Sequence, residues 1–283
     1  MKEQKSARRE DGSAPNWGQV AGRAALALAI ALFVAFLSLP LIALLMRVPV
    51  GDLPDYLGRP FVRNALLLSL FTSLGSLGIM LGLGTPLAFV LARRNFVGKR
   101  VLDTLVDLPL VLPPAVAGIA LLLAFGRRGL LGPILEGTGL DIAFSTAAVV
   151  LAQTFVASPF YVKAARAAFQ DVPRELEESA ATDGAGAWAR FRHVLVPLAL
   201  PGITGGAIMA WARALSEFGA TILFAGNFEG RTQTMPLAIY TALESDLNAA
   251  IVLSGVLLVA SLAILVAFRF LSGKQTGLVG FGS

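Results

Sequence analysis

The sequence contains no cysteine and a single histidine among its 283 residues. Without cysteine there are no disulfide bonds, no thiolate metal sites and no cysteine nucleophile. The one histidine, His193, has no Cys, His or carboxylate neighbour at ligand spacing, and we interpret it as a surface or interface residue. No intramembrane catalytic set such as H-E-x-x-H is present, which argues against a membrane-embedded enzyme.

A phosphate-binding loop of the form G-x-x-x-x-G-K-[ST] is also lacking. The Gly98–Lys99 pair has no Gly-rich loop before it. Nucleotide chemistry in this chain is therefore not expected, and any ATP must bind a partner.

Charge is scarce as well. Charged residues make up 14% of the chain, hydrophobic residues 56%, and the mean hydropathy is +0.74. Soluble domains carry about 25% charged residues. We therefore predict an integral membrane protein in contact with lipid. The net charge of +5 then bears on membrane orientation and does not indicate a nucleic-acid partner.

Long apolar runs are what the chain has most of. A spanning helix needs roughly 20 apolar residues. Six segments qualify, which predicts an all-α polytopic membrane protein: 22–46, 64–92, 101–125, 142–165, 198–224 and 249–271. The first run is too long for the apolar region of a cleaved signal peptide. No internal repeat is evident.

The Lys and Arg residues orient these spans. With the N-terminus in the cytoplasm, 16 of them fall in cytoplasmic pieces, six in outer loops and one, Arg213, within a span. Cytoplasmic loops carry the excess of Lys and Arg. We expect both termini inside, with tails at 1–21 and 272–283, a transmembrane domain at 22–271, and a cytoplasmic segment at 171–197.

The 171–197 segment has the local signals of a helical hairpin. Asp171 is a candidate N-cap, and Pro173 suits the first turn. Gly184 is suited to ending the helix with positive φ. A second short helix is expected near 187–194, with an exposed Trp188, before Pro197 and Pro201 lead back to the membrane. Such a hairpin fits a groove on another protein, or rests on the lipid surface; the local signals leave both open.

The spacing of this segment resembles the EAA loop of ABC-importer permeases. Glu178, Ser179 and Ala180 are followed at the family spacing by Gly184, and then by Val194, Val196 and Pro197. Ser replaces the first Ala, and Val replaces Ile and Leu. The resemblance implies that the loop docks into an ATP-hydrolysing subunit. The residues expected to couple the two subunits are Glu178, Ser179, Ala180, Asp183, Gly184, Gly186, Val194 and Pro197.

Three longer blocks, at 108–132, 211–227 and 231–246, resemble the molybdate and tungstate permeases. Sulfate and thiosulfate permeases are close relatives and remain the alternative. The resemblance implies a non-catalytic subunit without cofactors of its own, since the ATPase binds ATP and Mg. It also implies a second permease copy, an extracytoplasmic oxyanion-binding protein, and a bacterial or archaeal cytoplasmic membrane.

Arg213 and Glu217 are the charges expected deep in a span, four residues apart on one helix face. Such charges face a cavity or the bundle interior. They form either a structural ion pair or a cation on the path of a dianion. Pro113 and Pro114 should kink the third span, as a gate hinge or as a packing kink. Gly78 and Gly82 form a Gly-x-x-x-Gly step suited to close helix contact.

A secondary transporter or channel is the rival from another class. Such proteins usually carry several functional charges at mid-membrane, and often inverted repeats. Here a single Arg–Glu pair is expected and no repeat is seen.

Overall fold

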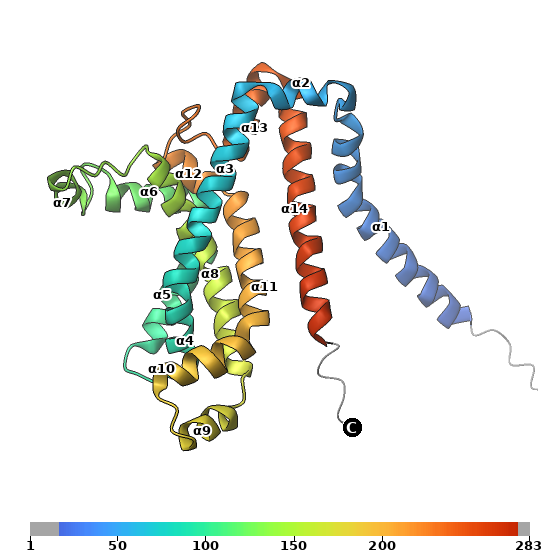
Figure 1. Cartoon of the computed structure of the whole chain (residues 1–283). Helices are drawn as coiled ribbons and strands as arrows, with labels where there is room; N and C mark the ends of the chain where they lie inside the picture. The colour runs from blue at the N-terminus through green and yellow to red at the C-terminus, as the bar shows by residue number, and fades with distance from the viewer. Residues whose placement is uncertain (1–16, 277–283) are drawn as a thin grey trace, which may run out of the picture. The chain divides into compact units, whose positions relative to one another are not determined.

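The computed structural model describes residues 17–276, with side-chain exposure described for residues 22–266. Every regular element within residues 17–276 is helical (Figure 1). In chain order the elements are α1 (Trp17–Arg47), η1 (Val50–Asp52), α2 (Leu53–Gly58), α3 (Pro60–Ile79), η2 (Met80–Gly84), α4 (Thr85–Arg93), α5 (Lys99–Val111), α6 (Pro114–Phe125), α7 (Gly132–Gly137), α8 (Thr146–Asp171), α9 (Arg174–Thr182), α10 (Ala187–Arg190), η3 (Phe191–Leu195), α11 (Val196–Leu215), α12 (Gly219–Phe224), α13 (Met235–Ser245) and α14 (Leu247–Thr276).

Two units make up the chain: the part up to Arg47, whose described helix is α1, and the part from Val48 onward. The expected tails at 1–21 and 272–283 lie largely outside the described residues. In the second unit, α8 and α11 run side by side. The α9–α10 hairpin lies at one end of the bundle, and α2 and α13 lie at the other (Figure 1).

The expected spans overlap helices in this structure, but the expected span 198–224 is not continuous, because α11 ends at Leu215 and α12 begins at Gly219. Five helical stretches of the described chain are long and apolar enough to cross a membrane: 22–47, 60–93, 146–171, 187–215 and 247–266. The remaining expected span, 101–125, is interrupted at Leu112 and Pro113, where α5 ends and α6 begins. Alone, the 12 residues of α6 would rise about 18 Å, short of the ~30 Å hydrocarbon core.

In two of these stretches a π-helical turn precedes a proline that does not break the helix. The turns η2 and η3 are π-helical, and each lies just before a proline at the second position of the next helix, Pro86 in α4 and Pro197 in α11. A proline cannot donate the backbone hydrogen bond of its turn, and the wider π turn accommodates that loss. We expected Pro197 to mark a junction after a separate short helix. Instead α10, η3 and α11 form one continuous helix from Ala187 to Leu215.

The tightest helix contact joins α8 and α11. A Cβ atom added at Gly202 would lie 2.4 Å from the Cβ of Ala168, and one added at Gly206 would lie 2.6 Å from the Cβ of Ala164. Small residues four apart on both helices therefore allow the backbones to approach closely. We expect the Gly-x-x-x-Gly step at Gly78 and Gly82 to pack either within the subunit or against a second copy of the chain, and only the first alternative can be compared with this structure. Neither glycine has a neighbour within 4 Å of its added Cβ in the described part of the chain.

A row of buried hydroxyls on α3 ties this core together. The indole Nε1 of Trp211 donates to Ser73 at 3.0 Å, and the hydroxyl of Ser76 donates to the carbonyl of Val150 at 2.9 Å. The hydroxyl of Ser69 accepts from the backbone N–H of Met235 at 2.7 Å. Buried polar groups cost free energy unless they are paired, so these bonds help set the alignment of α3 against α8, α11 and α13.

The α13 helix was not predicted. It has 11 residues, too few for a span, and its buried side chains Met235 and Ala238 pack in one cluster with Val62 and Ala65 of α3 and Leu253 of α14. Next to it, the carboxylate of Asp246 accepts the backbone N–H of Ala249 at 3.0 Å and pairs with Arg59 at 2.6 Å. Both interactions lower the pKa of Asp246 below its ordinary value.

The α8–α11 contact makes a prediction that a matched pair of variants can test. Gly202→Ala should destabilise the protein, because the added methyl group overlaps Ala168 and overpacking costs about 1–3 kcal/mol. Gly78→Ala, the same change in open space, should be neutral or stabilising by up to ~1 kcal/mol through helix propensity. The thermal unfolding midpoint in detergent measures both. Equal effects of the two variants would contradict the tight crossing.

Candidate functional site

The hairpin consists of α9 and the α10–η3 helix, joined by a turn at Gly184. Gly184 has φ +85°, as predicted for the residue that ends the helix. Its N–H bonds the carbonyl of Ala181 at 3.1 Å, and the next N–H, of Ala185, bonds the carbonyl of Ala180 at 2.9 Å. This pair of bonds is the Schellman motif, which favours glycine at the left-handed position.

The start of α9 differs from the prediction. Asp171 is the last residue of α8 and does not cap α9; the N-cap is Pro173, without a side-chain hydrogen bond. The cause is the length of α8, which continues six residues beyond the expected span end at 165. The acidic residues Glu175 and Glu177 still occupy the first turn, where carboxylates stabilise the positive end of the helix.

Aromatic side chains anchor the hairpin to the bundle. The ring of Phe191 in η3 lies 4.9 Å from Phe89 of α4, 6.1 Å from Phe169 of α8 and 5.6 Å from Trp188. Arg93 at the end of α4 adds a hydrogen bond of 2.7 Å to the carbonyl of Val172. Each aromatic pair contributes about 0.5–1.5 kcal/mol beyond area burial, so a displacement of the hairpin is opposed by contacts to two spans, through α4 and α8.

The residues expected to couple to an ATPase do not form one element. Glu178, Ser179 and Asp183 are exposed on or just after α9, Gly184 and Gly186 are in the exposed turn, Val194 lies in η3, and Pro197 lies in α11. Trp188 is 69% exposed, as expected for an aromatic residue offered to a partner. The first five residues, Trp188 and also Pro197 are exposed in the single chain. Ala180, on α9, and Val194 are partly buried, and Val194 and Pro197 belong to the continuous helix that follows the turn.

Two helix breaks meet away from the hairpin. One separates α5 from α6 at Leu112 and Pro113, and the other separates α11 from α12 at residues 216–218. A Cβ atom added at Gly219 would lie 2.6 Å from the Cβ of Pro114. One added at Gly118 would lie 2.8 Å from the carbonyl oxygen of Ala220. The first turns of α6 and α12 are therefore in direct contact.

Arg213 and Glu217 form the expected ion pair, with Nη2 and Oε2 2.7 Å apart. Their setting differs from the prediction, because α11 ends at Leu215 and Glu217 lies beyond it. The second oxygen of Glu217 accepts the backbone N–H of Ala220 at 2.9 Å, in the first turn of α12. The Glu217 side chain is 1% exposed and that of Arg213 29%. The pair thus bridges the break and leaves the arginine partly accessible.

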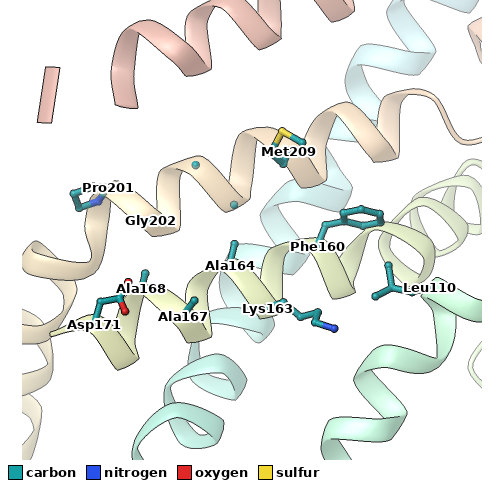
Figure 2. A pocket seen from close by; sticks show the side chains of 12 residues that line it. Leu110, Phe160, Lys163, Ala164, Ala167, Ala168, Asp171, Pro201, Gly202 and Met209 are labelled. Carbon is teal, nitrogen blue, oxygen red and sulfur yellow. The ribbon is translucent and has the colours of Figure 1, made fainter. Parts of the chain in front are cut away.

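Two cavities run along α8 from the hairpin end to these breaks. The inner cavity, of about 820 Å³, lies over the α8–α11 crossing. Asp171 and Pro201 are at one end of it, and Phe160, Met209 and Leu110 of α5 are at the other (Figure 2). The break cavity, of about 140 Å³, is lined by Arg213, Pro114 and Leu112, and it shares Leu110 and Phe160 with the inner cavity.

Sequence reasoning missed three residues of these cavities: Leu110, Phe160 and Lys163. Lys163 lines the inner cavity and pairs with Asp107 of α5 at 3.0 Å. We had placed it in a cytoplasmic piece because it lies near the predicted end of its span. The signal available in the sequence was the spacing of three residues between Phe160 and Lys163, which places both side chains on one face of α8. Among residues 22–266, no group of three or more His, Asp or Glu side chains is placed to hold a metal ion.

Comparison with known sequences identifies the family. The model of the family described as "Binding-protein-dependent transport system inner membrane component" matches residues 84–271. The molybdenum transport system permease protein of Mycobacterium bovis is 46% identical over 228 residues, which are 81% of this chain and 86% of that protein. A probable sulfate transport system permease of Chlorokybus atmophyticus is 34% identical over 239 residues, 83% and 84% of the two chains.

The fold agrees with these relatives. A chain of the crystal structure of a bacterial ABC transporter involved in the import of the acidic polysaccharide alginate superimposes with a TM-score of 0.70 at 20% identity, covering 91% of this chain and 98% of that one. This is the type I fold of ABC-importer permeases, in which a partner subunit hydrolyses ATP. The chain therefore belongs to the binding-protein-dependent transport system inner membrane components, the membrane-spanning permease subunits of ABC importers.

Proposed function

We propose that this permease carries molybdate, or the closely similar tungstate, into the cell. The observation that carries the proposal is the 46% identity to a molybdenum permease over 81% of the chain, against 34% to a sulfate permease over a similar length. Sulfate is the alternative substrate. Both are tetrahedral dianions, so selection between them rests largely on the binding protein that delivers them.

The partners follow from this role. ATPase subunits lie on the cytoplasmic side and bind ATP and Mg. An extracytoplasmic binding protein delivers the anion, and a second copy of this chain completes the pathway. In support, one solved relative is an alginate transporter in complex with a periplasmic protein. Both termini are cytoplasmic. When Lys163, which lines the inner cavity, is left out, 15 Lys and Arg residues remain in the pieces placed inside, against six in the outer loops.

The hairpin at 171–197 is the coupling element. Its exposed part, from Glu178 to Trp188, enters a groove of the ATPase, and its continuous helix carries the displacement to Leu215. The aromatic cluster around Phe191 supports this role, because it joins the hairpin to α4 and α8 as well as to α11. An element that only rested on lipid would not need such an anchor.

The paired breaks are the gate. Pro113 and Pro114 open the helix at one break, Arg213 and Glu217 bridge the other, and the contact between Pro114 and Gly219 makes the two move together. Helix breaks at membrane depth are tolerated where they are buried in protein or line a water-filled cavity. Arg213 is the cation at this point, and its partial exposure toward the break cavity allows it to attract a dianion.

The substrate is tested by reconstituting the complete transporter in proteoliposomes with its cognate binding protein. Calorimetric titration of the binding protein with molybdate, tungstate and sulfate is combined with anion-stimulated ATPase activity. We expect molybdate and tungstate to bind much more tightly and to stimulate hydrolysis. Tight sulfate binding without a response to molybdate would overturn the substrate, and a complex with two different permease chains would point the same way.

Gly184→Ala should uncouple the transporter. Alanine at φ +85° costs about 1–2 kcal/mol and would loosen the turn between α9 and α10. Gly139→Ala is the matched control, since Gly139 has φ +73° and open surroundings in a loop outside the hairpin. We expect lower molybdate uptake and weaker co-purification of the ATPase for the first variant only. Equal losses in both would show a general folding effect.

Removing the charges of the Arg213–Glu217 ion pair tests the role of Arg213 in transport. Arg213→Ala alone leaves the buried Glu217 unpaired and should cost about 3–5 kcal/mol of stability. The double variant Arg213→Gln/Glu217→Gln removes both charges and keeps an acceptor for the Ala220 N–H. We expect it to assemble, with uptake slowed about tenfold, or ~1.4 kcal/mol in the barrier.

The control for that double variant is Arg59→Gln/Asp246→Asn, which removes an exposed ion pair elsewhere and should transport normally. Assembly with unchanged uptake in the Arg213/Glu217 double variant would exclude a pathway role for Arg213. Failure of that variant to assemble, with the control intact, would leave Arg213 a purely structural role.

A further inference from the structure

The inner cavity is lined mostly by apolar and small residues, with two charged side chains, Lys163 and Asp171, among them. Lys163 is 54% exposed, and its partner Asp107, on the neighbouring α5, is 46% exposed. Lys163 lies eight residues before the end of α8, or about 12 Å along the helix axis. The 26 residues of α8 rise about 39 Å, more than the ~30 Å hydrocarbon core, so its last turns extend beyond the core, and the predicted span ends at 165. Lys163 therefore lies near the hairpin end of its span, where a charged side chain faces water or the protein interior. The floor is made of Gly202, Gly206, Ala164 and Ala168, so no large side chain fills it.

The inner cavity and the break cavity share two lining side chains, Phe160 from α8 and Leu110 from α5. Figure 2 shows both at the same end of the inner cavity, opposite Asp171 and Pro201. Phe160 is 38% exposed and Leu110 41%, so neither is locked in the core. An apolar constriction between two wider spaces blocks ions by excluding water.

Each cavity is also lined by one cationic side chain that is paired with a carboxylate. Lys163 lines the inner cavity and is paired with Asp107; Arg213 lines the break cavity and is paired with Glu217. A paired cation attracts an anion only weakly. Conduction requires sites weak enough to release the ion, and partly neutralised cations meet that requirement for a dianion.

We propose that the inner cavity and the break cavity are consecutive segments of one anion path, closed between them by an inner gate formed by Phe160 and Leu110. Lys163 is the specificity-determining cation of the inner segment. The inference rests on the proposed import function but adds a second gate, distinct from the helix breaks. The anion passes Arg213 at the outer gate, crosses the constriction, and leaves past Lys163 toward the hairpin end.

The absence of cysteine makes this directly testable, because single cysteines can be introduced without background. Three are needed: Ala167→Cys in the inner cavity, Leu112→Cys in the break cavity, and Val259→Cys as an apolar control on α14, where the side chain is 56% exposed. The complete nucleotide-free transporter, in inside-out vesicles, is treated with a membrane-impermeant anionic thiosulfonate from the cytoplasmic side.

We expect Ala167→Cys to react about tenfold or more faster than Leu112→Cys and Val259→Cys. Adding Phe160→Ala, or independently Leu110→Ala, should raise the rate at Leu112→Cys about tenfold and leave Ala167→Cys unchanged. Phe71→Ala is the matched control, since Phe71 is 71% exposed and lines neither cavity. Reaction at Val259→Cys as fast as at Ala167→Cys, or no effect of either truncation on Leu112→Cys, would overturn the path.

The role of Lys163 has its own readout. With Ala167→Cys, the ratio of reaction rates for anionic and cationic thiosulfonates should fall about threefold or more in Lys163→Gln and be kept in Lys163→Arg. An unchanged ratio in Lys163→Gln would remove the residue from the path.

None of these rates depends on which anion is carried. If the labelling pattern holds but molybdate neither protects Ala167→Cys nor is taken up, the anion path through the two cavities is supported and molybdate is rejected as the substrate. If molybdate uptake is normal and the labelling pattern is not observed, the anion path through the two cavities is rejected and the proposed import of molybdate is kept.

Discussion

The close crossing of α8 and α11 is the constraint on which the rest of the second unit depends. Gly202 and Gly206 lie against Ala168 and Ala164 with no room for another methyl group. In a membrane there is no hydrophobic driving force between helices, so close packing of small residues must hold them together. Small residues also leave space above the contact. One feature therefore both fastens the two helices and creates the inner cavity over them.

What the two helices carry explains why their alignment matters. The α11 helix continues at one end into the hairpin and at the other reaches Arg213 and the break before α12. The α8 helix presents Phe160 and Lys163 to the cavity and Phe169 to the aromatic cluster. A shift of α8 along α11 would thus alter the hairpin anchor, the cavity and the gate together. This is the kind of concerted change that a transport cycle driven from one end requires.

The sequence was informative where a local signal decides the outcome. Apolar run length predicted the spans, and the left-handed glycine was located at Gly184 by the spacing of the hairpin. It was less informative where tertiary contacts decide. Pro113 was expected to kink a span and instead ends a helix, because α6 turns to pack on α12. Pro197 was expected at a junction and lies within a helix, because a π turn absorbs it. Glu217 has the spacing of a helical pair but lies past the helix end. Phe160 and Leu110 come from different helices, and only the fold brings them together.

The π turn η3 has a mechanical consequence. It places one extra residue in a helical turn, and one residue corresponds to a rotation of about 100° around the helix axis. The proposed docking part of the helix, at Trp188, is thereby offset around the helix axis from the proposed gate part, at Arg213, by an angle that a regular α-helix would not have. The two parts belong to one continuous helical stretch, 29 residues long from Ala187 to Leu215. If the hairpin is displaced by a partner as proposed, the π turn sets the direction in which Arg213 turns.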